Sequence, residues 1–252
     1  MVEGFESFRK WFKGYEDCYT IIGGTACDIL MSEATLDFRA TRDVDMILLI
    51  ENRFAEFSSL FWEYIEAGGY RCGWRNSELP HFYRFTEPQS KEYPAMIELF
   101  SRRPDFQMKN PEVYLTPLPI SDEISSLSAI MLDEDYYNLM LAGRRIVDGV
   151  SVLGAEYLIL FKVKAWIDLK QKKADGLHVN ERDLRKHKND IFRLYMIVEP
   201  SSKIILNEKV MADVHKFIEM IVLENVNLSD IGIKGVTFEE ILEQLKKIYL
   251  LG

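Results

Sequence analysis

The sequence predicts an α+β protein with a mixed sheet and helices in its first part and only helices in its second part. Up to about residue 152, short apolar stretches of strand length alternate with stretches whose apolar residues recur at helical spacing. After Gly154, stretches of helical spacing follow one another with hardly any strand pattern. We therefore expect two domains, residues 1–152 and residues 153–252.

Aromatic and aliphatic residues define the elements of the first domain. Phe5, Phe8 and Phe12 recur at the spacing of a short amphipathic helix over 5–13. The apolar stretch 19–22 predicts a buried strand that ends at two glycines. The elements expected further along are a strand at 43–50, a helix at 53–66, and strands at 70–74, 81–86 and 95–100.

Turn and capping residues set the ends of several elements. Thr25, with Asp28 three positions later, has the form of a helix N-cap, so a helix is expected over 26–32. Prolines between residues 104 and 121 predict an extended or looped chain there. The pair Asp148-Gly149 tolerates positive φ at both turn positions and predicts a tight hairpin over 146–151. The second domain is expected to consist of helices at 155–173, 182–198, 208–224 and 238–250.

Charge, cysteine content and hydropathy exclude several classes of protein. The 252 residues include 31 Lys and Arg against 40 Asp and Glu, a net charge of −9, so any site for a polyanion must be a local basic patch. Three scattered cysteines exclude a disulfide framework and a CxxC zinc site. No apolar run approaches the roughly 20 residues that cross a bilayer, and the first residues lack a leader pattern. We expect a cytoplasmic protein without membrane contact.

Two aspartates at the start of the second strand are candidate metal ligands. In an extended chain alternate residues share a face, which places Asp43 and Asp45 about 7 Å apart. Arg39 and Thr41 precede them on the same face. Such a carboxylate pair suits a divalent cation, whereas in a dry core the two charges would repel each other. The alternative is a polar strand end facing water, but the apolar run 46–50 places the acids at the mouth of the core.

The glycine pair before the first long helix is a candidate phosphate-binding turn. Gly23 and Gly24 end a strand and open a helix, so backbone N–H groups can meet an anion, which the helix dipole favours. The alternative is an ordinary strand–helix turn with Thr25 as its cap. The turn lacks the Gly-Lys-Ser/Thr of a P-loop and the GxGxxG of a dinucleotide-binding fold.

A third acid lies on a later strand. Glu98 is the lone carboxylate of the apolar stretch 95–100. Such a residue usually points to solvent. The other interpretation is that it supplies the third oxygen ligand of a two-metal site, or the base that deprotonates an attacking hydroxyl.

The order of these motifs resembles the nucleotidyltransferase superfamily, which is marked by a Gly-Gly or Gly-Ser turn, an Asp-x-Asp pair and a third acid on a later strand. The turn at 23–26, followed by Arg-x-Thr-x-Asp-Val-Asp at 39–45, is similar to the AbiEii/MenA-type branch. That branch comprises the toxin-type nucleotidyltransferases of prokaryotic toxin–antitoxin and abortive-infection systems. The stretches 158–165 and 186–194 resemble its helical motifs. This chain has Gly-Gly-Thr where the superfamily has Gly-Ser, so the contact to phosphate falls to Thr25.

The resemblance implies a nucleotidyltransferase-like sheet and a metal-dependent enzyme that moves NMP from an NTP to an acceptor hydroxyl. Two Mg²⁺ ions would be held by the implied catalytic residues Asp43, Asp45 and Glu98. The implied nucleotide-binding residues are Gly23, Gly24, Thr25, Arg39, Thr41, Lys162, Lys188 and Asp190. The second domain would close a cleft over the acids. The implied acceptor is RNA, such as tRNA, or protein, and a cognate antitoxin would be a partner.

Two lysines fall on the apolar stripes of helices in the second domain. At 100° per residue, Lys162 and Lys188 each lie among apolar side chains of their own helix. A lysine on an inward stripe needs an anion or must extend to solvent. Each therefore either meets NTP phosphates or pairs with a local carboxylate, Asp190 being a candidate. Residues 162–193 hold ten Lys and Arg against five Asp and Glu, and the alternative interpretation of this basic patch is a solvated helix pair.

Two other functions remain open on the sequence. A non-catalytic protein with the same fold would bind nucleotide or a partner without needing both aspartates. Metal-dependent NTP binding therefore distinguishes the enzyme from such a protein. A small-molecule nucleotidyltransferase of the antibiotic-modifying type should lack an extended basic surface. The basic patch at 162–193 disfavours that function.

Overall fold

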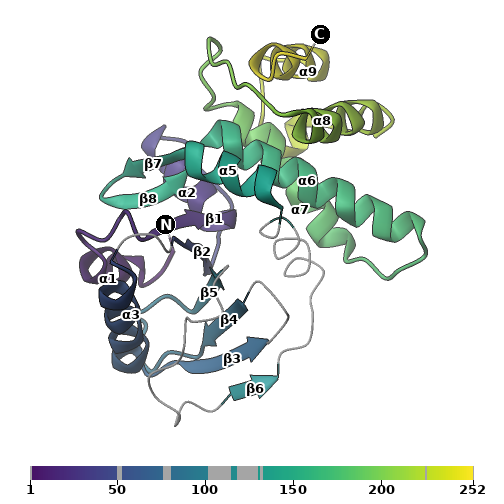
Figure 1. Cartoon of the computed structure of the whole chain (residues 1–252). Coiled ribbons are helices and arrows are strands. Elements are labelled where there is room, and N and C mark those ends of the chain that lie inside the picture. The colour runs from purple at the N-terminus through teal and green to yellow at the C-terminus, as the bar shows by residue number, and fades with distance from the viewer. Residues whose placement is uncertain are drawn as a thin grey trace. The chain divides into compact units, whose positions relative to one another are not determined.

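The computed structural model describes residues 2–49, 53–75, 81–101, 115–117, 130, 133–224 and 226–251 (Figure 1). The chain divides into two compact units. The sheet unit comprises Met1–Ile120 and Arg144–Gly154, and the helical unit comprises Ser121–Gly143 and Ala155–Gly252. The segment Ser121–Gly143 thus groups with the helices after residue 154 rather than with the strands before it. The expected α+β class is confirmed, because all described strands lie in the sheet unit.

The described strands form one eight-stranded mixed sheet in the order β6-β3-β4-β5-β2-β1-β8-β7. The strands are β1 (Tyr19–Ile22), β2 (Asp43–Leu48), β3 (Arg71–Arg75), β4 (His81–Thr86), β5 (Met96–Ser101), β6 (Leu115–Pro117), β7 (Arg144–Val147) and β8 (Val150–Leu153). β2 lies between antiparallel β1 and parallel β5, and β4 runs antiparallel to β5. The five strands expected between residues 19 and 100 are confirmed. β6 falls within 104–121, and the rest of that stretch lies outside the described residues.

The helices of the sheet unit begin and end close to their predicted bounds, with one correction. They are α1 (Phe5–Trp11), α2 (Gly23–Glu33) and α3 (Phe54–Gly68). α2 begins at Gly23 with Ile22 as its N-cap, so the prediction that Thr25 caps a helix starting at residue 26 is wrong. The Thr25 hydroxyl instead donates a hydrogen bond to the backbone carbonyl of Asp43. The physical reason is that Gly23 adopts φ +66°, which lets the chain enter the helix directly from β1.

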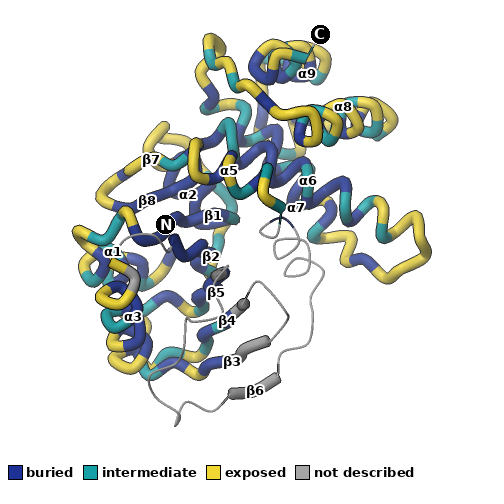
Figure 2. The backbone as a smooth tube through the Cα atoms, viewed as in Figure 1, coloured by how far each residue is buried: buried dark blue, intermediate teal, exposed yellow. Residues whose placement is uncertain are grey.

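The two faces of the sheet carry different side chains. α3 covers one face, where the ring centroid of Phe61 lies 5.4 Å from that of Phe85 on β4. Phe85 pairs with Ile97 across β4 and β5, so the next residue, Glu98, points to the opposite face. Asp45 is the partner of Glu98 in the register between β2 and β5 and shares that face. Figure 2 shows the central strands β1 and β2 buried along most of their length.

The predicted hairpin over residues 146–151 is present at the β7 edge of the sheet. β7 and β8 pair antiparallel, with Val147 opposite Val150. The turn residues Asp148 and Gly149 have φ values of 49° and 75°. Positive φ at both positions is the geometry that an Asp-Gly hairpin turn requires.

In its described residues, the helical unit contains the four helices that the sequence predicts and two shorter elements that it does not. The predicted helices are α6 (Ala155–Ala174), α7 (Glu181–Tyr195), α8 (Glu208–Ile221) and α9 (Phe238–Ile248). The unpredicted elements are α5 (Glu134–Ala142) and the 3₁₀ turn η1 (Leu228–Ile231). Side-chain caps fix several starts, including the capping box in which Thr237 and Glu240 bond to each other's backbone N–H. Across the described part of the chain, every helix is too short or too polar to cross a membrane.

Candidate active site

The glycine turn and the Asp-x-Asp pair meet in the sheet unit. A Cβ built on Gly23 would lie 1.8 Å from Oδ2 of Asp45, far inside any allowed contact. The absence of a side chain at Gly23 is therefore what lets the backbone turn lie against this carboxylate. Ile22, the last residue of β1, pairs with Asp45 across the strands, which explains the close approach. Asp45 is buried, with 9% of its surface exposed.

Gly24 lies close to two further predicted site residues, Thr41 and Arg39. A Cβ on Gly24 would lie 2.9 Å from Oγ1 of Thr41 and 3.4 Å from Nη2 of Arg39. The Arg39 guanidinium also lies 5.0 Å from the centre of the Phe38 ring, which helps to hold its orientation. The turn, a hydroxyl and a cation therefore surround one point at the N-terminus of α2, where the helix dipole favours an anion.

Thr25 links the glycine turn to β2, the strand that carries Asp43 and Asp45. Its side chain is buried and donates a hydrogen bond to the carbonyl oxygen of Asp43, the first residue of β2. The hydroxyl therefore orients the aspartate pair through the backbone. Its predicted contact to phosphate stays a prediction.

A row of charged residues crosses three neighbouring strands on the same face. Asp45 on β2 is paired with Glu98 on β5, and Glu98 is paired with Arg84 on β4. Neighbouring strands lie about 4.8 Å apart, so Glu98 stands directly between an aspartate and an arginine. Nε and Nη2 of Arg84 lie 2.7 Å and 2.5 Å from Oε1 of Glu98. The register places Glu98 beside Asp45, and the prediction that Glu98 reaches a shared metal site stays a prediction.

The aspartate pair fits Mg²⁺ as two ligands, not as part of a cluster of three acids. Among the residues the structure covers, no three His, Cys, Asp or Glu side chains lie close enough together to hold a metal ion. Asp43 and Asp45 still fit Mg²⁺, because proteins bind this ion through one or two carboxylates, and water and substrate phosphates complete the octahedron. This arrangement provides two aspartates on one face, with Glu98 paired with Arg84.

In the helical unit, Lys162 has a local partner. Its Nζ on α6 lies 3.2 Å from Oδ2 of Asp190 on α7, and Nη1 of Arg193 lies 3.6 Å from the other carboxylate oxygen. The side chain of Lys162 is 5% exposed and that of Asp190 is fully buried. The inward position predicted for Lys162 is confirmed, and its anion in this structure is a carboxylate. The predicted contacts of both residues to a nucleotide stay predictions.

Lys188 pairs with a different carboxylate from the one considered on the sequence. Its Nζ lies 3.3 Å from Glu224, which also accepts a hydrogen bond from Lys170 at 2.6 Å. The Lys170 ammonium, aided by Lys188, holds the pKa of Glu224 below its usual range. The proposed partner Asp190 is wrong for Lys188, because Asp190 faces α6 and pairs with Lys162.

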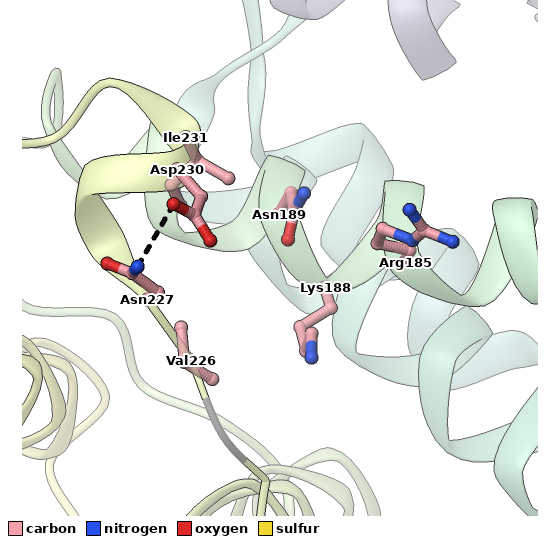
Figure 3. A pocket seen from close by; sticks show the side chains of 7 residues that line it. All are labelled: Arg185, Lys188, Asn189, Val226, Asn227, Asp230 and Ile231. Atoms are coloured by element: carbon pink, nitrogen blue, oxygen red, sulfur yellow. Dashed lines mark hydrogen bonds between the residues drawn. The ribbon is translucent and has the colours of Figure 1, made fainter.

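Lys188 also lines a polar cavity of about 760 Å³ between α7 and the segment around η1 (Figure 3). The cavity is lined by Arg185, Lys188, Asn189, Val226, Asn227, Asp230 and Ile231. In Figure 3 the side chains of Arg185 and Lys188 leave α7 in different directions. The two cations therefore do not converge on one anion here.

Arg84 is the residue that sequence reasoning missed. It lies in the stretch 81–86, which was predicted as a strand without a functional role. Its alternation with Tyr83 and Phe85 indicates a polar face, but nothing in the sequence gives the register that places it opposite Glu98. The sequence signal that could have pointed to Arg84 is its charge among the aromatic residues of this strand.

Comparisons with known proteins show a distant fold similarity. No family model and no curated protein match the chain. Among solved structures, the chain is similar to an antigenic nucleotidyltransferase-like protein from Paracoccidioides brasiliensis, with a TM-score of 0.44 and 15% sequence identity. The similarity covers 84% of this chain and 83% of that one. Because identity and TM-score are this low, we infer function from the residues of the site alone.

Replacing Gly23 by Ala should damage both the fold and the site. An alanine at φ +66° costs about 1–2 kcal/mol of the free energy of unfolding, since L side chains disfavour this region. The new methyl group must also displace Asp45. The matched control is Gly14→Ala, where φ is +86° and a Cβ would meet nothing within 4 Å. Thermal melting should fall in both variants, but Mn²⁺ affinity, measured by titration, should fall only in Gly23→Ala.

Replacing Glu224 by Gln should lower stability in a pH-dependent way. Folding depresses the pKa of Glu224, so its ionised form stabilises the fold above the unfolded-state pKa of about 4.3, and this contribution is lost as pH falls through the folded-state value. The pair is partly exposed, so the expected loss at pH 7 is about 1 kcal/mol or less. Denaturant melts of both proteins should differ at pH 7 and converge below about pH 4. An unchanged difference at low pH would contradict this assignment.

Proposed function

We propose that this chain is a metal-dependent nucleotidyltransferase that moves NMP from an NTP to an acceptor hydroxyl. The observation that carries the proposal is the packing of the Gly23–Gly24 turn against Asp45, Thr41 and Arg39. It joins an anion-binding helix N-terminus to a pair of carboxylates on one strand face. A triphosphate with a bound divalent cation needs both features, because donors bind its phosphates and carboxylates bind its cation.

Each side chain of the site has a role in this reaction. The backbone N–H groups of Gly23 and Gly24 bind the phosphates at the start of α2, and Arg39 neutralises phosphate charge. Asp43 and Asp45 would hold Mg²⁺, with Glu98 as the third acid. When bound, the metal ions neutralise the triphosphate and lower the pKa of the acceptor hydroxyl. Thr25 keeps Asp43 in register with the turn.

The helical unit would supply further cations to the nucleotide. Lys162 and Lys188 are the proposed phosphate contacts, and each would add phosphate to its present carboxylate partner. Asp190 would then orient Lys162 rather than touch the nucleotide, because it is fully buried. A charge-assisted hydrogen bond to phosphate contributes about 1.5–3 kcal/mol.

The class of acceptor follows from the resemblance and from charge. The AbiEii/MenA-type resemblance adds RNA or protein as acceptor and a cognate antitoxin as partner. Residues 162–193 carry an excess of Lys and Arg in an otherwise acidic chain, which suits a polyanionic acceptor. A small-molecule acceptor would not need such a patch.

Incubation with each labelled NTP, Mg²⁺ and a cell extract tests the proposal. The labelled NMP should appear in one class of molecule, separated by nuclease and protease digestion, and only when Mg²⁺ is present. The wild-type chain and Asp45→Asn should be compared in parallel. Labelling that persists undiminished in Asp45→Asn would assign the activity to a contaminant and remove the proposed function.

A further inference from the structure

The polar cavity between α7 and η1 is a second candidate binding site, separate from the glycine turn and the aspartate pair. Its lining residues in the described part of the chain all belong to the helical unit. Residues of both α7 and η1 line it, and these two elements pack against each other. The volume of about 760 Å³ falls within the range of small-molecule sites, roughly 300–1,000 Å³.

Two of the polar side chains that line the cavity already serve the fold. Asn227 caps η1, because its side chain accepts a hydrogen bond from the backbone N–H of Ser229 and donates one to Asp230 at 3.0 Å. Lys188 pairs with Glu224 at 3.3 Å. Both side chains are therefore explained without a ligand.

Three other polar groups of the cavity have no such role. The Arg185 guanidinium and the Asn189 amide make no hydrogen bond or ion pair with a residue that the structure describes. Asp230 accepts a hydrogen bond from Asn227 through Oδ1, and its Oδ2 has none within the described part of the chain. A guanidinium, an amide and a carboxylate oxygen therefore border the cavity with binding capacity that the fold does not use.

The two opposite charges lie on different elements. Arg185 and Asn189 are four residues apart on α7, so they share one face of the helix and lie about 6 Å apart along its axis. Asp230 belongs to η1, and in Figure 3 it lies on the other side of Asn189 from Arg185. The cavity therefore offers a cation, an amide and a carboxylate in that order, and Val226 and Ile231 add apolar surface.

We propose that this cavity binds a zwitterionic peptide of two or three residues, with its carboxylate on Arg185, its ammonium on Asp230 and a peptide group on Asn189. Arginine binds carboxylates through its planar fork, and an asparagine amide can both donate to and accept from a peptide group. A free amino acid carries both charges on one carbon, whereas each residue of an extended peptide adds about 3.3–3.6 Å between them. A nucleotide carries only negative charge, which Asp230 would repel.

Isothermal titration of the tripeptide alanyl-leucyl-alanine into the full chain tests the proposal. Two derivatives each lack one charge: the N-acetylated tripeptide lacks the ammonium, and the C-terminal amide lacks the carboxylate. The proteins compared are wild type, Arg185→Gln and Asp230→Asn. Arg182→Gln is the matched control, because Arg182 is an exposed arginine of the same helix that does not line the cavity. Circular dichroism melts check that each variant is folded.

We expect saturable binding of the tripeptide to the wild-type chain, and affinity about tenfold or more lower for either derivative. Acetylation should cost nothing further in Asp230→Asn, and amidation nothing further in Arg185→Gln, because each pair of changes removes the same contact. Arg182→Gln should bind like wild type.

Absence of saturable tripeptide binding to the wild-type chain would overturn the inference. Equal affinity for the tripeptide and both derivatives would also overturn it, as would binding of AMP in place of the tripeptide. Arg185 and Asp230 do not belong to the proposed nucleotide site. Failure of this test would therefore leave the proposed function standing.

Discussion

Replacing either Asp43 or Asp45 by Asn is expected to abolish metal-dependent nucleotidyl transfer while the chain stays folded. The change removes a carboxylate ligand, and metal-ion stabilisation of the transferring phosphoryl group contributes several kcal/mol, so activity should fall about a thousandfold or more. Asn has nearly the shape of Asp, so the packing of Gly23 against residue 45 is kept. Removing one of the neighbouring negative charges also relieves repulsion without metal.

Activity and thermal stability measured on the same preparations check this expectation. Both variants should melt at the wild-type temperature or slightly above it in the absence of metal. Asp37→Asn is the matched control, because Asp37 is an exposed acid of the same unit, outside the site. If Asp43→Asn keeps full Mg²⁺-dependent activity, the assignment of the metal ligands is wrong.

Replacing Asp190 by Ala is expected to destabilise the helical unit by about 3–5 kcal/mol. The change leaves Lys162 with 5% of its side chain exposed and without the carboxylate that now lies 3.2 Å away. An uncompensated buried charge is costly, because the interior solvates it poorly. Asp168→Ala on α6 is the control, since Asp168 pairs with Lys164 at 3.2 Å in a more exposed bridge.

The companion variant Lys162→Met separates a structural lysine from one that also binds nucleotide. Methionine removes the charge and fills a similar volume, and Arg193 still lies 3.6 Å from Asp190, so the loss of stability should be smaller than in Asp190→Ala. If Lys162 contacts phosphate as proposed, nucleotide affinity should fall about tenfold. Unchanged affinity in a stable Lys162→Met variant would leave the lysine a purely structural role, and a wild-type melt for Asp190→Ala would contradict the ion pair itself.

Patterns local in the sequence predicted most of the elements of this fold. The strands around residues 19–22 and 43–48 and the helices α6 to α9 follow from apolar periodicity, which reports burial directly. The Asp148-Gly149 turn follows from the φ values that only such residues adopt easily. α5 was not predicted, because its apolar pattern is weak and its packing comes from helices that follow it much later in the chain.

The candidate site was predictable as a set of residues and not as a set of contacts. The glycine turn and the aspartate pair were joined on the sequence by their resemblance to the motifs of the nucleotidyltransferase superfamily. The partner of Glu98 depends on the register of β4 against β5, which no local pattern fixes. The partners of Lys162 and Lys188 likewise depend on which helix faces pack together. Asp190 was a candidate for either lysine, and the packing pairs it with Lys162.

The role of Thr25 shows how a correct motif can be assigned the wrong contact. A Thr followed by an acid three positions later is a common N-cap pattern, but the glycine at residue 23 can adopt positive φ and starts the helix three residues earlier. The hydroxyl then faces β2 and bonds to the carbonyl of Asp43. Backbone freedom at one glycine therefore outweighed a side-chain capping preference.

Isothermal titration of NTP into the wild-type chain, with and without Mg²⁺, tests the central claim most directly. The claim is that the glycine turn and the aspartate pair act together as a metal-dependent nucleotide site. We predict saturable binding that requires Mg²⁺, falls about tenfold or more in Asp45→Asn and stays at the wild-type level in Asp37→Asn. Binding of equal strength without Mg²⁺, or binding that Asp45→Asn leaves unchanged, would contradict it.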